Sequence, residues 1–253
     1  MTRIIAVVSG KGGVGKTTFV ANLGAALAGM GKNVIVLDAN LTTPNLGIHL
    51  GIPLFPITLH DVLKGRANIR DAIYDHESGL KVIPAGISLR DLRGVDSSSL
   101  PNALLDLLGA ADIVILDAAA GLGREALAAM EAADEMIVIT NPDLPAVTDA
   151  LKAVKLAEQL GTKTLGVVVN RVKGQKHEMR REEILGMLDD ISLLAEVPED
   201  INVQKAIAAR VPVIHHKPNA QASHAIRRTA AALVGRSYFI DKPWHQRLFG
   251  FLR

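Results

Sequence analysis

The chain of 253 residues contains no cysteine, which excludes disulfides, thiolate metal sites and cysteine nucleophiles. It also lacks any apolar run near the roughly 18 residues that a membrane-spanning helix requires. The apolar run after Arg3 is too short for the core of a signal peptide. Hydrophobic residues make up 49% of the chain, which supports a sizeable core. We therefore expect a cytoplasmic protein with one large α/β domain.

The most informative motif lies near the N-terminus. Residues 10–17 read G-K-G-G-V-G-K-T, directly after the apolar run 3–8, and fit the phosphate-loop pattern G-x-x-x-x-G-K-[ST]. Glycines let the backbone wrap round a phosphate, and the helix predicted to follow adds its positive N-terminal end. Lys16 would reach the β- and γ-phosphates, and Thr17 would hold Mg²⁺. The predicted nucleotide-binding residues here are Gly10, Lys11, Gly12, Gly13, Val14, Gly15, Lys16, Thr17 and Thr18.

Apolar segments alternate with helix-period segments along the chain. The strands lack clean polar alternation, which predicts a doubly wound, mostly parallel sheet covered on both faces, with functional residues at the strand carboxyl ends. We expect an ATPase domain over residues 1–235, a linker over 236–242 and a C-terminal helix over 243–253. The predicted strands are Arg3–Val8, Asn33–Leu37, Leu80–Pro84, Asp112–Leu116, Glu135–Thr140, Thr164–Val169 and Leu193–Glu196, and the predicted helices include Thr17–Met30, Ala146–Leu160 and Asn219–Val234.

Two acidic residues follow predicted strands. Asp38 follows the second strand, where it can hold Mg²⁺ through water or help to orient the attacking water. Asp117 follows the strand Asp112–Leu116 and is a Walker-B candidate, although a strand-end aspartate can also cap the next helix. The predicted metal-holding residues are therefore Thr17, Asp38 and Asp117.

The stretch K-G-G-V-G-K-T-T resembles the deviant Walker-A ATPases of the MinD/ParA group, and the resemblance extends to about Val234. It implies that Lys11 reaches across a nucleotide-sandwich dimer to the partner's phosphates. Residues 38–45 resemble the first switch D-x-D-x-x-x-x-N of MinD, with Asn40 in place of the second aspartate and Asn45 matching. Asparagine is a poor base, so we expect slow or absent hydrolysis with binding retained. Residues 117–121 resemble the second switch D-x-P-A-G, with Ala119 in place of proline.

Further motifs match the base-binding side of the family. Residues 140–143 resemble T-N-P-E, where Asn141 can equally only close a turn. The resemblance implies that Asn170 binds adenine and that Arg171 stacks nearby. Residues 197–200 resemble the I-P-E-D loop beside adenine, and they also fit the acidic first turn of a helix. The predicted base-site residues are Asn170, Arg171, Pro198, Glu199 and Asp200.

The C-terminal region is basic and aromatic. Residues 201–253 carry nine Lys/Arg and one acidic residue, and five of the eight aromatic residues lie in the last 16 positions. A helix over 243–253 would place an apolar face opposite a basic one, which is typical of an interfacial membrane helix. The alternative is a tail that packs on its own domain or on a neighbour. The predicted membrane-contacting residues are Trp244, Arg247, Leu248, Phe249, Phe251 and Leu252.

These motifs favour a MinD-like ATPase with ATP and Mg²⁺ as cofactors. The resemblance implies a homodimer with sandwiched ATP that contacts anionic lipid on the inner face of the cell membrane. It also implies a regulatory or cargo protein as a partner, and a role in placing division-site or polar machinery. The rival is a ParA-like DNA-partitioning ATPase, although the apolar tail argues against nucleic acid. Its candidate phosphate contacts are Arg210, Lys217, Arg227 and Arg228. A metabolic ligase or metallochaperone on the same fold is a third reading, and the lack of cysteine argues against the chaperone.

Overall fold

The computed structural model of the protein describes residues 2–52, 54–189 and 191–239 and contains an eight-stranded sheet. The strand order is β3-β4-β2-β5-β1-β6-β7-β8, and all neighbours are parallel except β3 and β4. This confirms the predicted doubly wound, mostly parallel fold. The strands are β1 (Arg3–Ser9), β2 (Val34–Ala39), β3 (Tyr74–Asp75), β4 (Lys81–Ile83), β5 (Ile113–Ala120), β6 (Glu135–Thr140), β7 (Lys163–Val172) and β8 (Leu193–Pro198).

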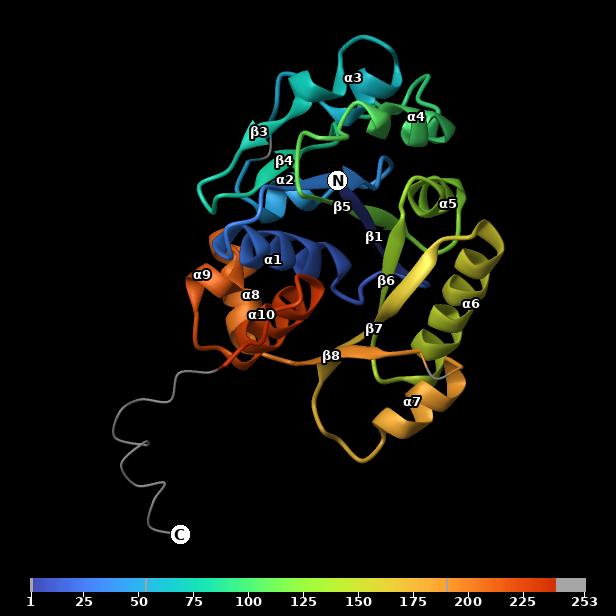
Figure 1. Ribbon diagram of the computed structural model, residues 1–253, viewed down its shortest axis with the longest axis vertical. Coiled ribbons are helices and arrows are strands. Elements are labelled where there is room, and N and C mark those ends of the chain that lie inside the picture. Colours follow the sequence, from blue (N-terminus) through green and yellow to red (C-terminus); the bar gives the residue numbers. More distant parts are fainter. Residues whose placement is uncertain (1, 53, 190, 240–253) are drawn as a thin grey trace.

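Helices cover both faces of this sheet, with α1, α9 and α10 opposite α5 and α6 (Figure 1). Alternate residues of β1 therefore enter different cores: Ile5 and Val7 pack with α1 and α10, whereas Ile4 and Ala6 pack with α5 and α6. The helices are α1 (Lys16–Gly29), α2 (Leu46–His49), α3 (Leu59–Leu63), α4 (Leu100–Leu105), α5 (Arg124–Glu131), α6 (Leu144–Leu160), α7 (Arg181–Met187), α8 (Ile201–Ala209), α9 (Val213–His216) and α10 (Gln221–Leu233).

Several strands run further than the sequence predicts, and in two of them the added residues include an aspartate. Asp38 lies inside β2 and Asp117 inside β5, because parallel pairing continues through the register pair Asp38↔Asp117 to Ala39↔Ala118. The two carboxylates are therefore fixed on neighbouring strands rather than on loops. Strand β3 was not predicted from the sequence. Its two residues pair with β4 in antiparallel fashion at the edge of the sheet.

The predicted domain boundaries stay predictions. The last helix of the described chain, α10, ends at Leu233, close to the predicted end of the ATPase domain. The predicted linker 236–242 lies partly outside the described residues, and the predicted membrane helix 243–253 lies wholly outside them.

Candidate functional site

The loop between β1 and α1 bends so tightly that two of its glycines adopt left-handed backbone. Gly13 has a φ of 80° and Gly15 a φ of 95°. Gly15 also precedes the first residue of α1, and a Cβ added to it would lie 2.3 Å from Nδ2 of Asn170. Residues 12–18 line a cavity beside this loop, at the N-terminal end of α1 where backbone N–H groups favour phosphate. Gly10 and Lys11 are not part of that lining.

Two carboxylates and one ammonium group are buried together beside the phosphate loop. Nζ of Lys16 lies 2.7 Å from Oδ1 of Asp117, and these side chains are only 7% and 1% exposed. Asp38 is fully buried on the neighbouring strand. Burial, reinforced by the charge of Asp117, raises the pKa of Asp38 to about 7. The cluster thus holds two carboxyl groups close to a single ammonium group.

This cluster fits a divalent cation. Oδ2 of Asp117 is buried and has no hydrogen-bond partner within the described residues. A cation held at this cluster would satisfy this oxygen and would offset the burial and the repulsion from Asp117 that raise the pKa of Asp38. Thr17, the third residue predicted to hold Mg²⁺, lines the same cavity as Lys16.

The segment 38–46, named here the first switch segment, is held in a compact turn. Oδ2 of Asp38 accepts hydrogen bonds from the backbone N–H groups of Asn45 and Leu46, both at 2.9 Å. The amide of Asn40 donates to the carbonyl of Thr43 (2.7 Å) and accepts from the backbone N–H of Thr43 (3.2 Å). An aspartate at position 40 could accept but could not donate, so asparagine fits this turn. Asn40 and Asn45 both line the phosphate-loop cavity.

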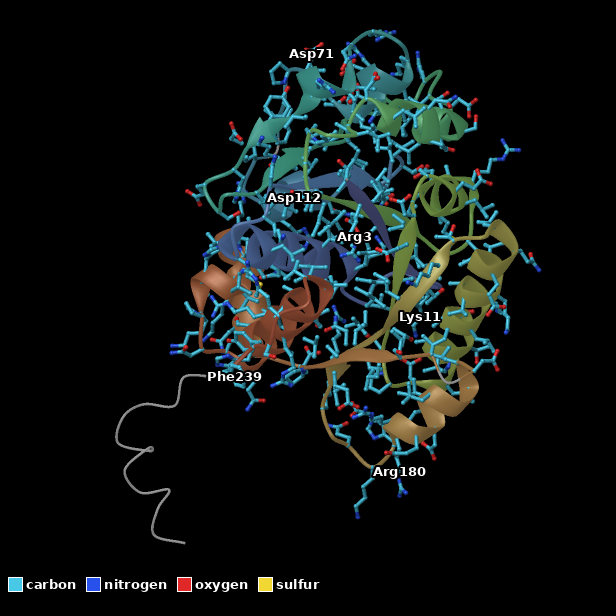
Figure 2. All side chains as sticks on the ribbon, viewed as in Figure 1. Arg3, Lys11, Asp71, Asp112, Arg180 and Phe239 are labelled. Carbon is cyan, nitrogen blue, oxygen red and sulfur yellow. The ribbon has the colours of Figure 1, made fainter. Side chains whose placement is uncertain are left out.

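Lys11 is paired within its own chain. Its Nζ lies 2.9 Å from Oδ1 of Asp143, and both side chains are partly exposed. Figure 2 labels Lys11, which is held near the start of α6 because Asp143 also accepts the backbone N–H of Ala146 and so caps that helix. The motif 140–143 therefore supplies a partner for Lys11 and a helix cap, and the backbone N–H of Asp143 donates to the carbonyl of Asn141 in a tight turn. In water such a half-exposed ion pair breaks easily.

The five predicted base-site residues come together in one pocket. Asn170 and Arg171 lie near the end of β7, and residues 198–200 follow from β8 into α8. The amide of Asn170 donates to the carbonyl of Val14 (2.7 Å), which ties the base pocket to the phosphate loop. Arg171 has a φ of 58° and lines both the pocket and the phosphate-loop cavity. The pocket is completed by Gly15, Thr18, Phe19, Val197, Val203, Gln204, Ile207 and Ile226.

Asp200 lies at the N-terminus of α8 as its N-cap, although the first turn itself contains no acidic residue, and its place beside adenine stays a prediction. It lines the base pocket and caps α8, accepting the backbone N–H of Asn202 at 2.9 Å. Burial alone would raise the pKa of Asp200, but hydrogen bonds from Asn202, Ala222 and Gln221 hold it below its ordinary value.

Several residues at the site escaped the sequence reasoning. Ser9 precedes the phosphate loop, and its buried Oγ has no hydrogen-bond partner in the described chain. His49 links Thr18 to the carbonyl of Asn45, at 3.3 Å and 2.9 Å. Because a carbonyl only accepts, the His49 nitrogen that faces it carries the proton. Glu125 accepts hydrogen bonds from the first switch segment. Only Ser9 had a signal in the sequence, its place directly before the motif.

Of the four basic residues predicted as candidate phosphate contacts, one is bound within the fold and three are exposed. The guanidinium of Arg227 donates to the carbonyls of Pro218 and Ile214, at 3.1 Å and 2.8 Å, so it is engaged in holding α9. Arg210, Lys217 and Arg228 are exposed. Phe239, labelled in Figure 2, is 83% exposed at the end of the described chain. No helix in the described part is long and apolar enough to cross a bilayer.

Residues 5–213 match the family model of the CobQ/CobB/MinD/ParA nucleotide binding domain. An uncharacterized ATP-binding protein of Methanocaldococcus jannaschii is 42% identical over 238 residues, which cover 94% of this chain and 90% of that protein. The septum site-determining protein MinD of Thermotoga maritima is 33% identical, covering 84% of this chain and 81% of that one. MinD of Pyrococcus horikoshii, solved in complex with Mg-ADP, has a TM-score of 0.89 at 35% identity, covering 92% of this chain and 96% of that one.

Proposed function

Because the chain belongs to the CobQ/CobB/MinD/ParA nucleotide-binding family, we propose that it is a MinD-like ATPase that closes a homodimer on ATP and Mg²⁺ and binds the inner face of the cell membrane. The observation that carries the proposal is the combination of two lysines on one glycine loop with the buried pair of carboxylates. Lys16 contacts Asp117 inside the chain, and Lys11 lies partly exposed outside the cavity lining.

The proposed chemistry divides among these groups. Lys16 exchanges its contact with Asp117 for the β- and γ-phosphates, while Thr17, Asp38 and Asp117 hold the metal and its water shell. Mg²⁺, when bound, neutralises the charge that develops on the transferred phosphoryl group. Asn40 orients the attacking water only through Oδ1, which already accepts from Thr43. Turnover is therefore slow.

Dimerisation follows from Lys11. Its ion pair with Asp143 is half exposed, so a partner's phosphates can compete for the ammonium group at small cost. We propose that each Lys11 leaves Asp143 for the nucleotide of the other protomer. ADP lacks the γ-phosphate that completes this contact, so the dimer opens after hydrolysis.

Membrane binding is assigned to residues 243–253. A helix of about 11 residues is marginal alone in water. Two copies on one dimer gain avidity through effective concentration, which makes residence on the membrane depend on ATP. A regulatory or cargo protein would dock on the dimer surface, and the biological role would be the placement of division-site or polar machinery.

Co-sedimentation with anionic lipid vesicles tests the proposal. Pelleting in Mg-ATP but not in Mg-ADP is the expected result, and deletion of residues 243–253 should abolish pelleting while leaving nucleotide binding intact. Lys11→Ala is the matched variant, because it keeps the tail but removes the proposed cross-dimer contact. It should therefore not pellet in Mg-ATP. Equal pelleting in both nucleotides, or pelleting that survives the deletion, contradicts the proposal.

The exposed Arg210, Lys217 and Arg228 favour one second candidate, a ParA-like DNA-partitioning ATPase. Arg227 contributes little to it, because its guanidinium is bound to two backbone carbonyls. Duplex binding that weakens steeply with salt, in protein that does not pellet with vesicles, would establish this alternative.

A further inference from the structure

A single carboxylate ties the first switch segment to a helix more than 80 residues away in sequence. Oε2 of Glu125 accepts the backbone N–H groups of Leu41 (2.9 Å) and Thr42 (3.2 Å), and Oε1 accepts the hydroxyl of Thr42. Both oxygens of Glu125 are therefore engaged by two consecutive residues of one loop.

Glu125 lies where the two segments that leave the aspartate-bearing strands come together. It is the second residue of α5, which begins directly after residues 117–123, named here the second switch segment. The first switch segment starts at Asp38 and the second at Asp117, so each leads out of a strand that carries one carboxylate of the cation cluster. Residues of both segments line a cavity between them. Glu125 lines the same cavity and makes the hydrogen bonds to the first switch segment.

The chemistry of the link favours a carboxylate. An ionised acceptor makes stronger hydrogen bonds than a neutral one, and the first turn of a helix stabilises negative charge. Glutamine would face both backbone N–H groups with one neutral carbonyl oxygen, which is a weaker acceptor, and would turn its NH₂ group toward the Thr42 hydroxyl. Thr42 is exposed and Glu125 is half-buried, whereas the Leu41 side chain is anchored in the core, so the Thr42 half of the link can form and break without opening the core.

We propose that Glu125 is a positioning residue that couples the two switch segments, so that residues 38–46 and 117–123 change together when the nucleotide changes. The inference rests on the proposed ATPase function, because it assigns Glu125 to turnover and not to binding. Glu125 lines neither the phosphate-loop cavity nor the base pocket. ADP affinity therefore depends little on it, whereas the placement of Asn40 for the reaction depends on it through the adjacent Leu41 and Thr42.

Amide hydrogen exchange on the full chain, with Mg-ADP as the probe, tests the coupling. In Glu125→Gln we expect at least tenfold faster exchange at Leu41 and Thr42 and unchanged exchange at Leu46, whose N–H is bound to Asp38. Mg-ADP should slow exchange at Leu41 and Thr42 in the wild-type protein and not in the variant. Glu183→Gln is the matched control, since Glu183 accepts the backbone N–H of Arg180 in the first turn of α7.

Kinetics separate positioning from general damage. Glu125→Gln should lower kcat about tenfold with the ADP dissociation constant within about twofold of wild type. Thr42→Ser should retain the wild-type kcat, and Thr42→Val should lower it. The double variant Glu125→Gln/Thr42→Val should have the same kcat as Glu125→Gln alone. Wild-type exchange or wild-type kcat in Glu125→Gln overturns the inference, as does a fall in ADP affinity that matches the fall in kcat.

The two proposals fail differently. If the wild-type protein neither hydrolyses ATP nor dimerises while the exchange pattern is as expected, the ATPase proposal is wrong and the coupling stands. If the protein is an ATPase and Glu125→Gln leaves exchange at Leu41 and Thr42 unchanged, the coupling is wrong and the ATPase proposal stands.

Discussion

Alanine substitutions at two glycines of the phosphate loop should have different effects, although the glycines have similar backbone angles. Gly13 and Gly15 both lie in the left-handed region, at φ of 80° and 95°. A Cβ at Gly13 would meet nothing within 4 Å, whereas a Cβ at Gly15 would lie 2.3 Å from Nδ2 of Asn170. The pair therefore separates the cost of backbone strain from the cost of displacing the base-site asparagine.

The magnitudes follow from these contacts. Alanine in left-handed backbone costs roughly 1–2 kcal/mol, which is the whole effect expected for Gly13→Ala. Gly15→Ala adds the movement of Asn170 and the loss of its hydrogen bond to Val14, together about 2 kcal/mol more. At about 2–4 °C per kcal/mol for a chain of this size, the midpoint of thermal unfolding should fall by about 5 °C for Gly13→Ala and about 10 °C for Gly15→Ala.

Thermal unfolding followed by circular dichroism, without nucleotide, measures both variants. Repeating the pair in an Asn170→Ala background removes the atom that the new Cβ would meet, so the two variants should then differ by less than about 2 °C. Equal destabilisation by Gly13→Ala and Gly15→Ala in the wild-type background would refute the reasoning. A difference that persists without Asn170 would also refute it, because the contact would then not be its cause.

Three further predictions concern the charged cluster and the first switch segment. Lys16→Met leaves Asp117 buried without its cation and should destabilise the protein by about 3–5 kcal/mol at pH 8, measured by urea unfolding, while wild-type stability would contradict the buried pair. The raised pKa of Asp38 means that the folded, unliganded protein holds a proton that the unfolded chain has lost, so the contribution of Asp38 to the free energy of unfolding should fall as pH rises from about 4 to 7. The stability of Asp38→Asn relative to the wild-type protein, measured by urea unfolding, should therefore rise over this range. Asn40→Asp should raise ATP turnover at least several-fold, measured by phosphate release, and an unchanged rate would show that position 40 does not limit hydrolysis.

The sequence predicted those parts of the site that depend on local pattern. The phosphate loop was predicted from its glycine and lysine spacing, and Asp38 from its place at the carboxyl end of an apolar run. The pairing of Lys16 with Asp117 and the contacts of Glu125 were not found, because each joins residues more than 80 positions apart through the order and register of the strands. No periodicity records that order, and β3 is too short to show any.

The central place of β1 in the sheet affects how the protein is made. This strand leaves the ribosome before the other seven described strands, yet its two neighbours are β5 and β6, within residues 113–140. The loop that follows it also depends on Asn170, which holds the carbonyl of Val14. During synthesis the phosphate loop is thus made early, but its surroundings form late, because more than 100 further residues must emerge before β1 gains both partners. A nascent chain that stops short of residue 170 would carry the whole phosphate-loop motif without the contact that fixes its shape.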